Sequence, residues 1–253
     1  PDEEFHVVLF QQMAKQAIQK IYEKGKIPII VGGTGFYIQA VLYDIDFSEN
    51  EKDTSYREEL EKLAQTKGAE YLHDLLRKVD EKSAQDIHAN NVKRVIRALE
   101  YFHQTGEKIS EHNEEQRKKV SPYNFSYFVL NDEREHLYER INLRVDQMIN
   151  EGLVSEVQSL KEKGYTRDMV SMQGLGYKEM LDYLDNKCSL EEAVEIIKRD
   201  TRHFAKRQIT WFKRESDVTW IDKKEYDYNE ERILKAMLQE LKERGIINEY
   251  NNG

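Results

Sequence analysis

The apolar positions of the first segment recur every three or four residues, which predicts an amphipathic helix over residues 5–21 that ends at Gly25. Residues 27–31 (IPIIV) then form an apolar run rich in β-branched side chains, which is typical of a strand buried in a parallel sheet. A glycine-rich stretch, residues 32–35, follows at once, and a helical pattern resumes at Phe36. The pattern predicts a helix, a buried strand, a tight turn and a second helix.

The next part of the chain lacks a strand pattern. Residues 56–79 and 84–102 show apolar stripes at helical spacing between charged faces. Residues 106–122 are polar and become basic toward their end, which predicts a mobile segment. Because this block separates two segments that carry strand patterns, we expect residues 48–122 to form a helical insertion.

Strand patterns return at residues 125–130 (FSYFVL) and 218–221 (VTWI). A long helix capped by Asn131 or Asp132 is expected to end near Gly152. Further helices are expected over residues 153–163, 178–184, 190–214 and 232–245. The order of elements predicts an α/β fold, a parallel sheet flanked by helices, whose core comprises residues 1–47 and 123–253.

Composition narrows the class of protein. Of the 253 residues, 39% are hydrophobic and 34% are charged, and the formal net charge of −9 argues against nucleic-acid binding by the chain as a whole. The basic residues are nevertheless concentrated in a few segments, which leaves a local basic groove open. The single cysteine, Cys188, excludes disulfide frameworks and cysteine metal sites and fits a reducing, cytoplasmic setting. The sequence has no apolar run long enough to span a membrane.

The glycine-rich turn at residues 32–35 is open to two interpretations. Such a turn can bind an anion or an acceptor atom, because glycine lets the main chain approach a ligand and the first helical N–H groups are free. The hydroxyl of Thr34 would add a donor and an acceptor. The turn can equally be a tight connection packed beneath a helix, and the local sequence does not choose between these two.

Residues 198–214 contain the richest concentration of cations. Arg199, Arg202 and Lys206 would share one face of a helix while aromatic side chains line another, an arrangement suited to phosphates and stacked bases. The alternative is a solvated basic face. On an earlier helix, Lys93 and Arg97 lie four residues apart and would project together.

Two other segments contain residues that could bind a substrate. Arg144, followed by Asp146, could hold a phosphate or form an ordinary ion pair. Residues 171–178 (SMQGLGYK) predict a loop whose glycines allow close approach of an extruded base. The seven histidines do not show metal-ligand spacing, so no metal site is predicted from the residues.

Five motifs occur in order along nearly the whole chain. They are residues 32–37 (GGTGFY), residues 91–100 (NVKRVIRALE), Arg144-Val145-Asp146 with Met148, residues 172–179 (MQGLGYKE) and residues 201–211 (TRHFAKRQITW). Together they resemble the tRNA dimethylallyltransferase family, whose members are also called tRNA isopentenyltransferases. The last two motifs are the most specific.

The resemblance implies a fold similar to P-loop kinases and an enzyme that uses Mg²⁺ and dimethylallyl pyrophosphate. Its substrate would be the N6 amine of the adenosine immediately 3′ of the anticodon. The resemblance implies catalytic roles for Thr34, beside the flipped adenine, and for Arg144, and it makes Arg202 and Arg207 candidates for binding phosphate. The residues expected to contact the anticodon stem-loop are Arg57, Lys93, Arg94, Val95, Ile96, Arg97, Gln173, Gly174, Leu175, Gly176, Tyr177, Lys178, Glu179 and Met180. We also expect a monomer.

The sequence departs from the family pattern at residues 88–91 (HANN), where the family usually has His-Pro-Asn-Asp. This difference argues against a helix-capping role there. The family's phosphate-binding loop and the aspartate that acts as general base would both precede Pro1. We therefore expect a polypeptide that begins at Pro1 to lack prenyl transfer. The alternatives are a small-molecule kinase of related fold and a non-catalytic RNA-binding module.

Overall fold

A computed structural model describes residues 1–47 and 55–248 of the chain. The chain divides into two compact units, Pro1–Ile38 with Tyr123–Gly253 (unit 1) and Gln39–Pro122 (unit 2). The insertion was expected to begin at residue 48, which lies outside the described residues. Unit 2 begins earlier because its entry and exit segments are hydrogen-bonded to each other. The N–H of Asp46 donates to Gln116 Oε1, and Lys119 Nζ donates to the carbonyl oxygen of Asp44, each at 2.9 Å.

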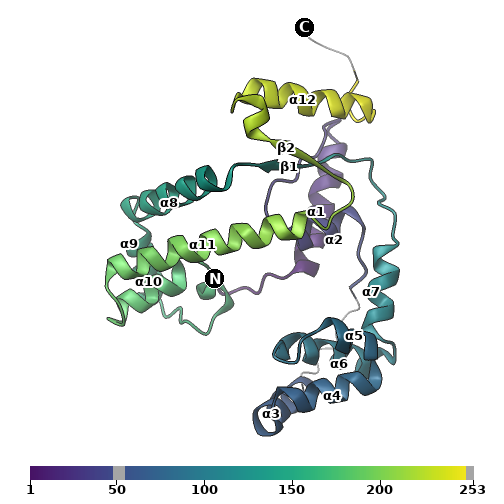
Figure 1. The fold of residues 1–253 in the computed structure, drawn as a ribbon, viewed down its shortest axis with the longest axis vertical. Coiled ribbons are helices and arrows are strands. Elements are labelled where there is room, and N and C mark those ends of the chain that lie inside the picture. The colour runs from purple at the N-terminus through teal and green to yellow at the C-terminus, as the bar shows by residue number, and fades with distance from the viewer. Residues whose placement is uncertain (48–54, 249–253) are drawn as a thin grey trace. The chain divides into compact units, whose positions relative to one another are not determined.

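The α-helices and strands of each unit are labelled in Figure 1. Unit 1 contains α1 (Val7–Tyr22), the start of α2 (Gly35–Leu42), β1 (Tyr127–Asn131), α8 (Arg134–Asn150), α9 (Leu153–Glu162), the 3₁₀ helix η1 (Val170–Gln173), α10 (Tyr177–Leu184), α11 (Leu190–Phe212), β2 (Val218–Asp222), the 3₁₀ helix η2 (Lys223–Tyr226) and α12 (Glu230–Glu243). Unit 2 contains the end of α2, α3 (Ser55–Lys67), α4 (Ala69–Val79), α5 (Glu81–Asp86), α6 (Val92–Thr105) and α7 (Ile109–Arg117). None of the helices in this part of the chain is both long and apolar enough to cross a membrane.

Strands β1 and β2 pair in parallel, with Tyr127 opposite Val218. Helices α8 to α11 form the connection between them, since parallel strands require a long crossover. The rings of Tyr127 and Phe212 meet edge to face at 6.0 Å, which packs the end of α11 on the sheet. The Thr219 hydroxyl donates to the Glu240 carboxylate of α12 at 2.9 Å. Both strands and their direction were predicted from the sequence.

The strand predicted at residues 27–31 is wrong within the described structure. This run lies between α1 and α2 without regular structure, and Ile29 and Val31 are 81% and 90% exposed. In the ranges 1–47 and 55–248, β1 and β2 pair only with each other. An apolar, β-branched run favours extended backbone, but a strand also needs a neighbour that takes up its N–H and C=O groups.

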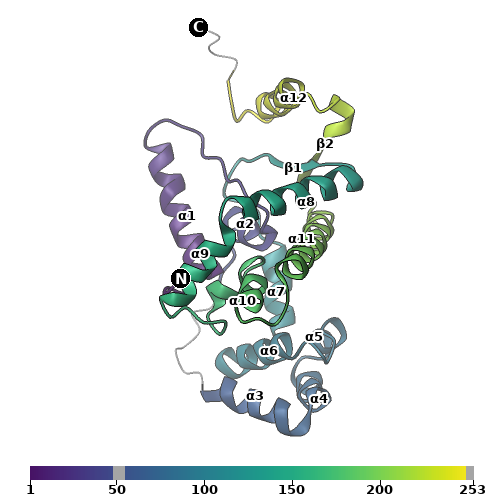
Figure 2. The same ribbon diagram turned by 90° about the vertical axis from the view of Figure 1, so that its left-hand side faces the viewer.

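The core of unit 1 lies among α8, α9, α10 and α11, and α8 and α11 lie side by side in Figures 1 and 2. Val145, Val157, Met180 and Ile197 are among its buried members. Gly152 adopts a left-handed conformation (φ 104°) between α8 and α9, where it ends the first helix as the sequence predicts.

At the carboxyl end of β1, the residue at the N-cap position of the next helix is not the one expected from the sequence. Glu133, whose side chain forms no cap hydrogen bond, occupies the N-cap position of α8, so the prediction for Asn131 or Asp132 is wrong. The Asp132 carboxylate instead lies 3.0 Å from His136 Nδ1 and accepts hydrogen bonds from the Glu133 N–H and the Tyr228 hydroxyl. Burial raises the pKa of Asp132, but these hydrogen bonds outweigh it and lower that pKa below its ordinary value.

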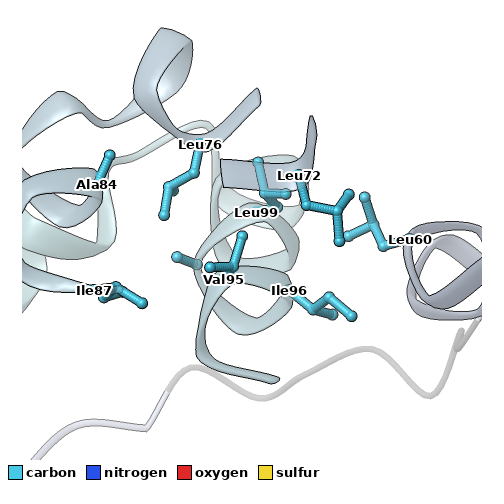
Figure 3. Packing of buried hydrophobic residues seen from close by; sticks show 9 residues of the cluster. Leu60, Leu72, Leu76, Ala84, Ile87, Val95, Ile96 and Leu99 are labelled. Carbon is cyan, nitrogen blue, oxygen red and sulfur yellow. The ribbon is translucent and has the colours of Figure 1, made fainter. Parts of the chain in front are cut away.

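Unit 2 has its own hydrophobic core, in which α3, α4 and α6 pack together (Figures 2 and 3). Leu60 from α3, Leu72 and Leu76 from α4, and Val95 and Leu99 from α6 are buried and face one another. The leucine stripes predicted from the sequence supply these contacts, which confirms the helical block.

Residues 106–122, in which no helix was predicted, contain α7. Asp80, which is fully buried, accepts hydrogen bonds from the N–H and the hydroxyl of Ser110 at 3.0 and 2.7 Å. It accepts the same pair of bonds from Ser83 at the start of α5. One carboxylate therefore caps two helices, and the cap of α7 comes from 30 residues away. No local pattern encodes such a cap.

Candidate functional site

The glycine-rich turn before α2 packs against α11. The side-chain amide of Gln208 donates a hydrogen bond to the carbonyl oxygen of Gly33 at 2.9 Å. A Cβ on Gly33 would overlap this amide, and a Cβ on Gly35 would overlap the indole ring of Trp211. Of the two interpretations of this turn, the structure shows close packing beneath a helix. The glycines are required because a side chain would hold the backbone away from α11.

Thr34 lies exposed at the start of α2. Its carbonyl oxygen accepts hydrogen bonds from the N–H groups of Tyr37 and Ile38 at 2.9 and 3.2 Å, which close the first helical turn. Its hydroxyl makes no hydrogen bond to any residue that the structure describes. The structure therefore leaves this hydroxyl available next to the contact between the turn and α11.

A hollow of about 460 Å³ lies on the face of α11 that includes Trp211. The side chains that line it are His203, Lys206, Arg207, Thr210, Trp211 and Arg214. These positions recur every three or four residues, so one face of α11 supplies all of them except Arg214, which lies in the turn just after the helix. Within the described ranges, Lys206, Arg207 and Arg214 form no ion pairs. Three uncompensated cations beside an aromatic ring suit a ligand that carries phosphate.

The local sequence explains why α11 presents this face. Ser189 and Glu192 form a capping box at its start, in which the Glu192 N–H donates to the Ser189 hydroxyl at 3.2 Å and the Ser189 N–H to the Glu192 carboxylate at 2.8 Å. Ala193, Ile197 and Phe212 are buried. Because the helix is held by these apolar positions, its cationic positions remain at the surface.

Of the two predicted phosphate ligands, Arg207 lines the hollow and Arg202 does not. Arg202 Nη1 donates to Asn142 Oδ1 on α8 at 2.6 Å. Arg144 is also on α8, exposed, with its Nη1 3.8 Å from Glu151 Oε2. The structure therefore does not bring Arg144 and Arg202 into the α11 hollow.

Lys206 was expected on a cationic helix face and lines the hollow, whereas Gln208 and Arg214 belong to this site but were not expected from the sequence. Arg214 continues the helical spacing of the lining residues just beyond the end of α11, whereas no local pattern identifies Gln208, whose partner Gly33 is remote in the sequence. Arg199, expected on the same face as Lys206, pairs instead with its neighbour Asp200 at 2.9 Å. When a helix carries cations on several sides, its sequence does not reveal which of them form ion pairs with acidic residues of the same helix.

The predicted base-binding loop before α10 is held from within. Gly176 has a positive φ of 98°, which favours glycine, and its N–H donates to the Glu179 carboxylate at 2.9 Å. Glu179 and Met180 are buried, so their side chains support the loop from within, and their expected contact with tRNA stays a prediction. Gln173 and Gly174 are exposed at its tip.

The other residues of this loop are half-buried. Leu175 lies between its two glycines. The Tyr177 hydroxyl donates to the Glu156 carboxylate, and this hydrogen bond raises the pKa of Tyr177 above its ordinary value. Lys178 Nζ lies 3.3 Å from Glu179 Oε1, within ion-pair distance.

Helix α6 of unit 2 carries a second group of cations. Lys93 and Arg94 are exposed, Arg97 is half-buried, and none of the three pairs with an acid in the part of the chain that the structure describes. Val95 and Ile96 point into the core beside Leu99 (Figure 3). Their side chains therefore anchor α6 in the core of unit 2, and the expected contact of these two residues with tRNA stays a prediction.

Two further expectations concern the surroundings of α6. Asn91 occupies its N-cap position without a side-chain cap hydrogen bond, which confirms the inference drawn from the departure at residues 88–91. Arg57 of α3, expected to contact tRNA, donates from Nε and Nη2 to the two carboxylate oxygens of Glu100 at 2.9 and 3.0 Å. This hydrogen-bonded pair raises the pKa of Arg57.

Comparison with known proteins decides the family. A family model described as IPP transferase matches residues 1–215. A tRNA dimethylallyltransferase from Lachnoclostridium phytofermentans is 64% identical over 247 residues, which cover 98% of this chain and 79% of the relative. This chain belongs to the tRNA dimethylallyltransferase family. The resemblance inferred from the five motifs is thereby confirmed.

Solved structures support the same conclusion about the fold. The full-length tRNA isopentenylpyrophosphate transferase from Bacillus halodurans is 43% identical with a TM-score of 0.66, and the match covers 97% of this chain and 77% of that one. A eukaryotic dimethylallyltransferase described as acting on tRNA has a TM-score of 0.71 at 31% identity, with 87% of this chain and 57% of that chain covered. The expected α/β fold class of this tRNA dimethylallyltransferase family member is confirmed.

The family resemblance also implies Mg²⁺. Among residues 1–47 and 55–248, no group of three or more His, Cys, Asp or Glu side chains could hold a metal ion. Because Mg²⁺ usually binds through one or two carboxylates together with substrate phosphates, its site stays a prediction from the resemblance.

Proposed function

We propose that this protein transfers the dimethylallyl group of dimethylallyl pyrophosphate to the N6 amine of the adenosine immediately 3′ of the anticodon in tRNA. N6 attacks the allylic carbon, the bond from this carbon to the pyrophosphate oxygen breaks, and N6 loses a proton to a base. The 64% identity to a tRNA dimethylallyltransferase over nearly the whole chain carries the proposal. It favours this activity over a small-molecule kinase.

The residues of the α11 hollow would bind phosphate groups. Lys206 and Arg207 are exposed cations on one face of α11, Arg214 is an exposed cation just after the helix, and Trp211 offers a flat surface beside them. The phosphates could belong to the RNA backbone or to the departing pyrophosphate, because both present the same oxygens to a guanidinium. Cations held in place would also stabilise the negative charge that develops on the leaving group.

The remaining expected residues would position the RNA. The Thr34 hydroxyl would hydrogen-bond to the adenine, and the exposed Gln173 and Gly174 would lie beside the extruded base. Lys93 and Arg97 would contact backbone phosphates, which contributes affinity without reading the sequence. The general base and the phosphate-binding loop, expected upstream of Pro1, stay predictions, as does the need for Mg²⁺.

Transfer is tested with the protein as its genome encodes it, including any residues upstream of Pro1. The protein is incubated with dimethylallyl pyrophosphate and a tRNA, and the digested nucleosides are analysed by mass spectrometry. We expect one adenosine to gain a dimethylallyl group, and a tRNA with guanosine at that position to remain unmodified. Absence of modification would overturn the proposal, and phosphate transfer from ATP to a small molecule instead would support the kinase.

The role of the hollow is tested in the same system with Arg207→Ala. Loss of one charge-assisted contact should weaken binding about tenfold. Weaker binding of an anticodon stem-loop RNA assigns the hollow to RNA, whereas weaker binding of dimethylallyl pyrophosphate assigns it to the pyrophosphate. Lys235→Ala, which removes an exposed cation from α12, is the matched control. Unchanged affinity for both ligands would contradict the phosphate-binding role.

A further inference from the structure

Glu100 is a buried carboxylate on the helix that carries the cations of unit 2. It is 5% exposed, and both its oxygens accept hydrogen bonds from Arg57. The Arg57 side chain remains 44% exposed. Since a guanidinium has five N–H donors, three of them are left over, and these make no hydrogen bond to another described residue.

The position of Glu100 along α6 places the Arg57–Glu100 pair next to the cations of that helix. Lys93, Arg97 and Glu100 are separated by four and three residues, so they lie on one stripe of the helix. At a rise of about 1.5 Å per residue, Glu100 follows Arg97 by about 4.5 Å along the axis. A free Glu100 would place a negative charge next to the cations, and its pairing with Arg57 places a guanidinium there instead.

The geometry of the pair leaves one side of the guanidinium open. Arg57 uses Nε and one N–H of Nη2 for Glu100, so one N–H of Nη1 and the second N–H of Nη2 form the adjacent, end-on edge. This edge can donate two parallel hydrogen bonds to a phosphate, which the point charge of a lysine cannot do. Holding the first edge fixes the direction in which the second points.

We infer that Glu100 is a positioning residue, which holds Arg57 as the third cation of the Lys93–Arg97 stripe and orients it toward an RNA phosphate. This inference rests on the proposed function, since RNA is the ligand of that stripe. A pair that only ties α3 to α6 would have no effect on RNA affinity beyond that of its charge. The two roles therefore predict opposite changes in RNA affinity when the charge of Glu100 is removed.

The decisive variant is Glu100→Gln, tested for binding of an anticodon stem-loop RNA. Removal of a negative charge alone would tighten RNA binding, whereas loss of the clamp on Arg57 should weaken it about tenfold. Glu70→Gln removes the same charge from an exposed position on α4 and is the matched control, which should bind equally or more tightly. Circular dichroism and thermal melting establish that both variants are folded.

A double-mutant cycle with Arg57→Gln isolates the coupling. Once Arg57 is absent, Glu100→Gln should no longer weaken RNA binding, because there is no guanidinium left to orient. Arg57→Lys keeps the charge without the fork and should lose about as much affinity as Glu100→Gln. If Glu100→Gln fails to fold, Arg57→Lys decides the matter, and affinity equal to the parent protein would overturn the inference.

Lys93→Ala separates failure of this inference from failure of the proposed function. If the parent protein does not bind the RNA, or Lys93→Ala leaves its affinity unchanged, the RNA-binding role of α6 fails and this inference fails with it. If Lys93→Ala weakens binding while Glu100→Gln binds as tightly as the parent or more tightly, only the role of Glu100 is overturned. Weakening by both variants, with loss of coupling in the cycle, supports it.

Discussion

Asp80 shows how much a single buried side chain can organise. All four of its hydrogen bonds come from Ser83 and Ser110, and these residues begin α5 and α7. Burial raises the pKa of Asp80, but the hydrogen bonds from the two serines outweigh it and hold this pKa below its ordinary value. The carboxylate is stabilised by neutral donors at two helix starts, where negative charge is favoured.

Asp80→Asn should lower the free energy of unfolding by about 2 kcal/mol at neutral pH, because an amide has one acceptor atom for four donors. A depressed folded pKa means that the ionised group stabilises the protein above its unfolded pKa of about 3.9. This stabilisation is lost as the pH falls through the folded pKa, so the gap between variant and parent should narrow in acid. Urea unfolding at neutral and acid pH measures both effects.

Asp86→Asn is the control for this prediction, since Asp86 is an exposed carboxylate at the end of α5. It should change stability little at any pH. A gap between Asp80→Asn and the parent protein that stays constant into acid would contradict the assignment of the effect to ionised Asp80.

For the cations too, the local sequence does not determine which side chains are available to a ligand. Arg202 and Arg207 lie on one helix, five residues apart, yet Arg202 is bonded to Asn142 and Arg207 lines the hollow. Asp146, which follows Arg144, pairs with Lys198 at 2.7 Å. Sequence motifs select these residues as a group, but their partners determine which of them remain available to a ligand.

Among the elements, the glycine-rich turn and α11 act together. The turn is close enough to α11 for Gln208 to bond its backbone and for Trp211 to cover Gly35. The indole also lines the hollow, so the position of the turn sets the position of one wall of the candidate site.

Gly35→Ala should therefore lower stability by about 1–3 kcal/mol, since the added methyl overlaps the indole of Trp211. It should also change the emission of Trp211, measured with Trp220→Phe as background because the chain has two tryptophans. Gly32→Ala is the matched control, because a Cβ at that position meets open space. Identical melting and emission for both variants would show that the turn does not press on Trp211.

For the molecule as a whole, the main feature is the presence of two separate cores. The buried cluster of unit 1 and that of unit 2 share no residues among those described. Each is built from helices that are near one another in sequence, except that unit 1 resumes after unit 2 at Tyr123. We therefore expect damage to one core to remain within its unit.

Leu76→Ala should destabilise unit 2 by about 2–5 kcal/mol through the cavity it leaves. Hydrogen exchange with mass spectrometry should show faster exchange in α3, α4 and α6, and little change in α8 to α11. Met180→Ala, in the core of unit 1, should give the reverse pattern. Faster exchange throughout the chain for either variant would mean that the two units unfold together.

Most helices, the two strands of the sheet and the family could be predicted from the amino-acid order, because periodicity, capping boxes and motifs depend on residues within a few turns of one another. The unpaired run at residues 27–31, the helix α7 and the choice of Arg207 over Arg202 could not. Each depends on a partner remote in the chain: a neighbouring strand, the Asp80 carboxylate, or Asn142 on another helix. Hydrogen bonds and close packing between such distant segments form only when the whole chain has folded, so they leave no local pattern.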